Sequence, residues 1–79
     1  MNTLQWPFVT AMEIREIFAR NLRHFRQTQG LSQEELAHRA DIDRTYISSL
    51  ERGIYSPSIE VLDRIATALG IKPEELIRK

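Results

Sequence analysis

The sequence predicts an all-α protein with five short helices in one small domain, and three observations lead to this prediction. From Ile14 onward, apolar residues recur every three to four positions, which is the period of a helix and not of a strand. Glycine or proline stands at the ends of these apolar segments, where helices commonly stop or start. The length of 79 residues is enough for one hydrophobic core but not for a second domain.

The first helix is predicted from Ile14 to Gln29, because one apolar stripe extends along this segment. Gly30 follows it and is expected to end the helix. Residues 1–12 contain Pro7 and show no sustained period, so they are expected to form an N-terminal arm. The members of the apolar stripe are Ile14, Ile17, Phe18, Leu22 and Phe25.

Two short helices separated by a tight break are predicted next. Ser32 and Glu35 have the spacing of a capping box at the start of a helix over residues 33–39. Asp41 tolerates the left-handed backbone that a sharp turn needs, and a third helix follows over residues 44–52. The residues expected to face inward are Leu36, Ala37, Ile47 and Leu50.

Two further helices complete the predicted fold. The fourth begins at Pro57 with Ser56 as its N-cap, and it ends at Gly70. The fifth begins at Pro73, and acidic residues occupy its first turn, where the helix dipole favours them. The core stripe of the fourth helix consists of Leu62, Ile65, Ala66 and Leu69.

The composition excludes several classes of function. No cysteine is present, which rules out a disulfide framework and a cysteine-based zinc site. His24 and His38 lack partners at ligand spacing, so neither a metal nor a cofactor is expected. No catalytic motif occurs, so the protein is not expected to be an enzyme. Because the sequence has no bilayer-length apolar run and no basic leader, we expect a cytoplasmic protein without a membrane partner.

The second predicted helix, the break and the third helix together form a helix-turn-helix over residues 33–52. One stripe of the third helix is polar and carries no carboxylate; its members are Thr45, Ser48, Ser49 and Arg52. Arginine pairs well with guanine and threonine contacts the methyl group of thymine, so this stripe suits the major groove of DNA.

The segment from Ser32 to Gly53, SQEELAHRADIDRTYISSLERG, resembles the Xre family of phage-repressor-type helix-turn-helix proteins. The resemblance implies a five-helix, lambda-repressor-like DNA-binding domain over residues 13–79. Within that family, the run DRTYIS and the short length are most similar to controller proteins of restriction–modification systems. At Asp41 the family usually has glycine, and both residues suit the turn.

The resemblance also implies roles for individual residues. Those expected to contact bases are Arg44, Thr45, Ser48 and Ser49. Those expected to contact the DNA phosphates are Gln33, Tyr46 and Arg52. Arg26 and Glu51 are expected to form a structural ion pair that ties the first helix to the third.

A homodimer is expected, because one recognition helix reads too few base pairs to define a site in a genome. The resemblance places the dimer contact on the fourth and fifth helices. The candidates are Val61, Ile71, Leu76 and Ile77, and the alternative is that Ile71 and Leu76 complete the monomer core. The arm has no basic residue, so Trp6 and Phe8 are expected to pack against the protein or its partner subunit.

The sequence therefore predicts a sequence-specific, DNA-binding transcriptional regulator, repressor or activator, with a short double-stranded operator and no small-molecule ligand. An antitoxin and a protein–protein adaptor with the same fold are the alternatives, and the net charge of zero favours the adaptor. However, the predicted first helix has four arginines to one glutamate, and we expect carboxylates to lie away from the DNA surface. The neutral total then predicts modest non-specific affinity for DNA.

Overall fold

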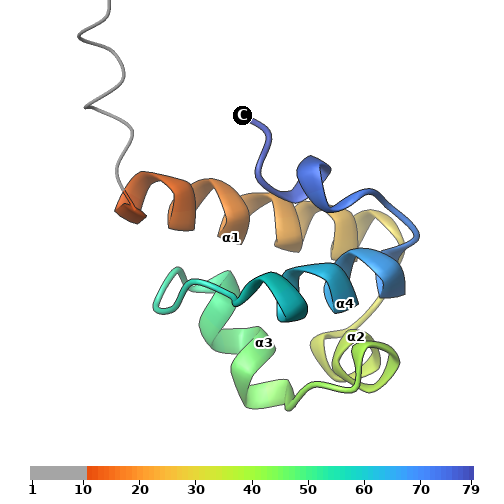
Figure 1. Cartoon of the computed structure of the whole chain (residues 1–79). Helices are drawn as coiled ribbons and strands as arrows, with labels where there is room; N and C mark the ends of the chain where they lie inside the picture. Colours follow the sequence, from red (N-terminus) through yellow and green to blue (C-terminus); the bar gives the residue numbers. More distant parts are fainter. Residues whose placement is uncertain (1–10) are drawn as a thin grey trace, which may run out of the picture.

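A computed structural model describes residues 11–79, which form four α-helices and one 3₁₀ helix (Figure 1). In chain order these are α1 (Ala11–Thr28), α2 (Gln33–Ala40), α3 (Arg44–Glu51), α4 (Ile59–Leu69) and η2 (Pro73–Leu76). No strand occurs in this range, so the all-α prediction is confirmed. The fifth predicted helix is a 3₁₀ turn of four residues, a length too short for a regular α-helix.

The helix-turn-helix lies on the opposite side of α1 from η2 (Figure 1). α1 packs against both α3 and η2, while α2 packs against α3 and α4. Every one of the five elements contributes to a single core. Its largest fully buried side chains are Phe18, Leu22, Leu36, Ile47, Leu50, Ile65 and Leu76.

The first helix departs from its prediction at the N-terminal end. It begins at Ala11, so the last two residues of the predicted arm are helical. Ile14 was predicted to be part of the core stripe but is exposed, because this end of α1 extends beyond α3 (Figure 1). The expectations for Trp6 and Phe8 concern residues outside the described range.

The turn between α2 and α3 adopts the predicted backbone conformation. Asp41 is left-handed, with φ 56° and ψ 50°, and it is the one non-glycine residue with positive φ in the described part of the chain. The side chain of Asp43 accepts a hydrogen bond from the backbone N–H of Thr45, at 2.7 Å, and so caps α3. Ala37, almost fully buried, provides the small contact surface that lets the two helices cross closely.

The start of α4 differs from the prediction. Ser58, and not Ser56, is the N-cap, and its Oγ accepts from the backbone N–H of Val61 at 3.1 Å. Pro57 therefore precedes the helix instead of opening it. The hydroxyl of Ser56 accepts a hydrogen bond from Arg15 Nε, at 3.3 Å, and thereby joins this loop to α1.

The four dimer candidates differ in what they offer to a partner. Leu76 has no exposed surface and belongs to the core of one chain, so its assignment to the dimer surface was wrong. Val61 and Ile71 are half-buried and pack against the core. Ile77 is 43% exposed, because it follows the last turn of η2 and faces away from the core.

We expect Leu76→Ala to lower the free energy of unfolding by about 2–5 kcal/mol, because it leaves a cavity among fully buried side chains. Ile77→Ala is the matched control and should cost less than about 1 kcal/mol. Urea unfolding followed by circular dichroism, at a concentration where the protein is monomeric, measures both. Equal effects of the two substitutions would contradict the placement of Leu76.

Candidate nucleic-acid interface

The outward face of α3 carries all the side chains predicted to read bases. Arg44 and Thr45 are exposed, while Ser48 and Ser49 are partly exposed one turn further on. Arg52, which follows the helix as its C-cap, is also exposed. The opposite face of α3 is apolar and fully buried, which fixes the polar stripe toward solvent.

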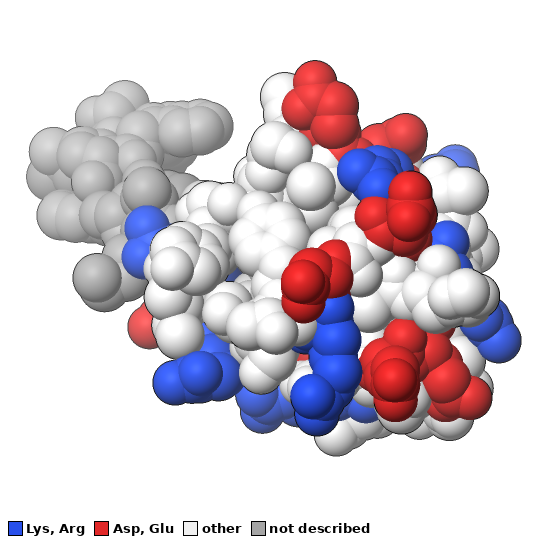
Figure 2. Space-filling view, turned by 90° about the horizontal axis from the view of Figure 1, so that it is seen from below, with Lys and Arg blue, Asp and Glu red and all other residues white. Residues whose placement is uncertain are grey.

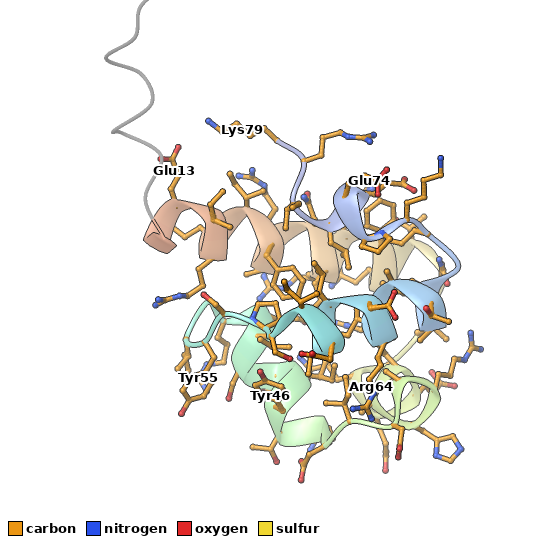
Figure 3. All side chains as sticks on the ribbon, in the orientation of Figure 1. Glu13, Tyr46, Tyr55, Arg64, Glu74 and Lys79 are labelled. Atoms are coloured by element: carbon orange, nitrogen blue, oxygen red, sulfur yellow. The ribbon has the colours of Figure 1, made fainter. Side chains whose placement is uncertain are left out.

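Gln33 and Tyr46 are partly exposed, as Ser48 and Ser49 are. Gln33 opens α2, and its side-chain Nε2 donates to Glu51 Oε1 at 3.1 Å. Tyr46 is half-buried, packs against the core, and has its ring centroid 6.3 Å from that of Tyr55 (Figure 3). These two of the three predicted phosphate contacts therefore also have partners within the protein.

A buried carboxylate lies behind the polar face. Glu51, at the last position of α3, is only 4% exposed. Nε and Nη2 of Arg26 donate to its two carboxylate oxygens at 2.5 and 3.0 Å, and Nη1 of Arg26 donates to the carbonyl of Leu31 at 2.8 Å. The ion pair implied by the family resemblance is thus present and is bidentate, the geometry that holds guanidinium and carboxylate most firmly.

Arg23 also contacts the end of α3. Its Nη2 donates to the carbonyl of Glu51 at 3.2 Å, and its Nε lies 3.7 Å from Glu51 Oε1. The side chain of Arg23 is half exposed, and the sequence predicts no role for it. The contact was missed because its partner lies 28 positions away, outside any local pattern.

These contacts determine the ionisation of Glu51. Burial raises the pKa of its carboxyl, but the hydrogen bonds from Arg26 and Gln33 and the charges of Arg26 and Arg23 act in the opposite direction and outweigh it. The pKa of Glu51 therefore lies below the ordinary glutamate value. The group is charged at neutral pH and bound on both oxygens.

The charge of the face formed by α2 and α3 is mixed. Figure 2 shows this face from below, with basic and acidic side chains interspersed: basic ones follow the lower left edge and also lie near the centre and at the right, and acidic ones lie at the centre, the lower right and the top. On the turn before α3, Asp41 and Asp43 are exposed. The expectation that carboxylates lie away from the DNA surface holds for the outer stripe of α3 but not for this turn, because both aspartates have local roles there.

Three further polar side chains, which the sequence did not single out, donate hydrogen bonds to carbonyls at the C-terminal ends of other helices. Asn21 Nδ2 donates to the carbonyl of Leu76 at 3.0 Å, and Gln29 Nε2 donates to that of Leu69 at 2.6 Å. Arg64 extends from α4 to the turn between α2 and α3 (Figure 3). Their partners are 23 or more positions away, so no local signal identifies them.

No group of three His, Cys, Asp or Glu side chains among residues 11–79 has the arrangement to hold a metal ion. In the same range, no helix has the length and apolar character needed to cross a membrane.

The tight turn, the buried inner face of α3 and its polar outer face define a helix-turn-helix protein. Residues 22–76 match the family model described as Helix-turn-helix, and the chain belongs to this family. The resemblance to Xre-type proteins and to restriction–modification controllers is confirmed by the relatives below.

Two relatives illustrate this membership. The Neisseria hypothetical transcription factor of Neisseria meningitidis serogroup B is 38% identical over 75 residues, which cover 95% of this chain and 71% of that protein. Control protein C.BamHI of Bacillus amyloliquefaciens is 40% identical over 65 residues, covering 81% of this chain and 80% of that protein.

Solved structures agree with the fold. The restriction-modification controller protein C.AhdI from Aeromonas hydrophila is 42% identical, with a TM-score of 0.77 over 78% of this chain and 94% of that one. The Neisseria transcription factor has a TM-score of 0.80 over 82% of this chain and 75% of that one. Both solved structures thus share the fold over about four fifths of this chain.

We expect acid to weaken the fold through Glu51. A carboxyl whose pKa is lowered by folding stabilises the protein above the pKa of the unfolded chain, and this contribution is lost as the pH falls through the folded value. Glu51→Gln should remove that part of the pH dependence and lower stability at pH 7 by about 3 kcal/mol, because Arg26 loses its charged partner.

Urea unfolding at several pH values between 7 and 3 measures this effect. Glu16→Gln is the matched control, because Glu16 is exposed on α1. If Glu51→Gln and the wild type lose stability in parallel over the whole range, the buried carboxylate does not carry the acid sensitivity.

Proposed function

We propose that this protein is a sequence-specific DNA-binding transcriptional regulator that inserts α3 into the major groove. The observation that carries the proposal is the outer face of α3: it is polar and without carboxylates, and an arginine lies at each end. An apolar inner face and a buried ion pair hold that stripe toward solvent. This is the arrangement through which helix-turn-helix proteins read base edges.

Each residue has a distinct part in this proposal. Arg44 and Thr45, at the start of α3, reach furthest into the groove and contact bases, with Ser48 and Ser49 one turn on. Gln33 binds a phosphate with its second amide N–H while the first stays on Glu51, so the side chain is oriented before DNA arrives. Tyr46 and Arg52 contact the sugar–phosphate backbone nearby.

The protein acts as a homodimer on a short operator with two half-sites. Ile77 is the most exposed of the candidate contact residues, and Val61 and Ile71 are partly exposed. The relatives named as control and controller proteins support a place for this protein among restriction–modification controllers. We expect it to act in the cytoplasm.

One observation favours a second function. The face formed by α2 and α3 carries both signs of charge, and the chain has no net charge, so electrostatic attraction to DNA is weak. A protein–protein adaptor or an antitoxin with the same fold would have such a surface. The adaptor differs from the proposed function in one measurement, the salt-dependent binding of DNA, whereas the antitoxin predicts that a neighbouring gene encodes a toxin.

We expect Arg44→Ala to weaken specific DNA binding about ten- to a hundredfold, because a bidentate arginine–guanine contact contributes about 1–3 kcal/mol. The assay is a gel shift with the region upstream of the protein's own gene. Arg78→Ala is the control, because Arg78 is exposed and follows η2, an element that lies on the far side of α1 from α3 (Figure 1). No salt-dependent binding by the wild type would favour the adaptor.

We expect sedimentation at micromolar concentration to detect a dimer, and Ile77→Asp to shift it toward monomer. A charge placed on an apolar contact loses its water without gaining a partner, so the dimer is disfavoured. The substitution should weaken operator binding and leave the unfolding of the monomer nearly unchanged. A monomeric wild type that still binds its operator tightly would refute the dimer.

A further inference from the structure

Arg64 links α4 to the turn of the helix-turn-helix through three contacts. Its Nε donates to the carbonyl of Ala40 at 3.2 Å, and its Nη2 donates to the carbonyl of Asp41. The same Nη2 lies 3.4 Å from the carboxylate of Asp41. Figure 3 shows the side chain pointing from α4 to this turn.

The two carbonyls are the natural binding partners of a cation at this point. Ala40 ends α2 and Asp41 is its C-cap, so their carbonyls have no acceptor role within the helix. The C-terminus of a helix also carries a partial negative charge. A guanidinium, with several donors in one plane, satisfies both carbonyls at once and keeps its charge.

The position of these carbonyls connects Arg64 to DNA reading. Only Ile42 and Asp43 separate Asp41 from Arg44, the first residue of α3. The backbone from α2 to α3 is left-handed at Asp41, so a small rotation there moves the start of α3. Arg64 holds the peptide groups on both sides of that residue's Cα to α4.

The contacts of Arg64 with the carboxylate and with the backbone carbonyl of Asp41 differ in strength. The carboxylate of Asp41 is fully exposed, and an ion pair in water contributes little. The carbonyls are backbone atoms, so any residue at position 41 supplies them. The hydrogen bonds to backbone therefore carry the link, and glycine at position 41 preserves it.

We propose that Arg64 is a positioning residue for DNA recognition. By capping α2 and holding the turn to α4, it sets the placement of Arg44 and Thr45 without contacting DNA. The inference rests on the proposed function of α3. Arg23 and Arg26 hold the far end of α3 through Glu51, so arginines from outside the helix-turn-helix fix α3 at both ends.

The test compares Arg64→Met, which keeps the aliphatic stem but removes the donors, with Arg64→Lys, Asp41→Gly and the control Arg78→Met. The probes are a duplex selected from a random pool by the wild-type protein and an unrelated duplex. Dissociation constants are measured for both over a series of salt concentrations. Circular dichroism at the assay temperature verifies that each variant is folded.

Arg64→Met should weaken binding of the selected duplex about tenfold, the scale of one lost charge-assisted hydrogen bond, and leave the unrelated duplex unchanged. Its salt dependence should keep the slope of the wild type. Arg64→Lys, which retains a donor, should recover part of the loss. Asp41→Gly and Arg78→Met should bind within about twofold of the wild type.

Three results would overturn the proposal. A salt slope that is less steep by about one indicates a direct phosphate contact by Arg64. An equal loss on both duplexes indicates a non-specific role. Unchanged binding by Arg64→Met indicates no role. If that variant does not fold, Arg64→Lys decides among the same outcomes, because it retains charge and a donor.

A measurement without DNA separates this inference from the proposed function. In nuclear magnetic resonance spectra of the free protein, Arg64→Met or Arg64→Lys should shift the amide resonances of Arg44 and Thr45, and Arg78→Met should not. A wild type that binds neither duplex would refute the proposed function alone. Unshifted resonances in the Arg64 variants would refute the positioning role even if the wild type binds DNA.

Discussion

The placement of the recognition helix depends on one buried carboxylate. Glu51 lies at the end of α3, and removing its charge from water is costly unless every oxygen has a donor. Arg26 from α1 and Gln33 from α2 supply those donors, so one group joins three helices. Removing one partner leaves an unpaired charge in the core. The pair therefore specifies how α1, α2 and α3 meet more than it adds to net stability.

Short helices in this protein are completed by side chains from distant elements. α2 and α3 have eight residues each, a length at which an isolated helix is unstable in water. Their terminal carbonyls need hydrogen-bond donors from elsewhere, because few N–H groups remain beyond each helix. In each of four cases a side chain from another part of the fold donates. Arg64 donates to the end of α2, Arg23 to that of α3, Gln29 (just after α1) to that of α4 and Asn21 to that of η2. The packing of the helices and the hydrogen bonding of their C-terminal ends therefore depend on each other.

This use of arginine changes the meaning of the neutral charge. Arg23, Arg26 and Arg64 all have partners within the fold, so their charges are committed to carbonyls and to carboxylates. The arginines left for DNA on the proposed surface are those at the two ends of α3. For the proposed regulator we expect a weak general attraction to DNA and an affinity that depends on base contacts and on a second subunit.

The sequence by itself determined the helical class, the capping box at Ser32, the left-handed turn at Asp41 and the family to which the chain belongs. These features follow from residues within about four positions of one another, where helical period and hydrogen-bond geometry act directly. Only the tertiary structure decided that Ile14 is exposed, that Leu76 is core, that Ser58 starts α4 and that Arg64 holds the turn. Burial and long-range hydrogen bonds depend on which elements meet in space. The residue pattern of one segment does not show which other segments pack against it.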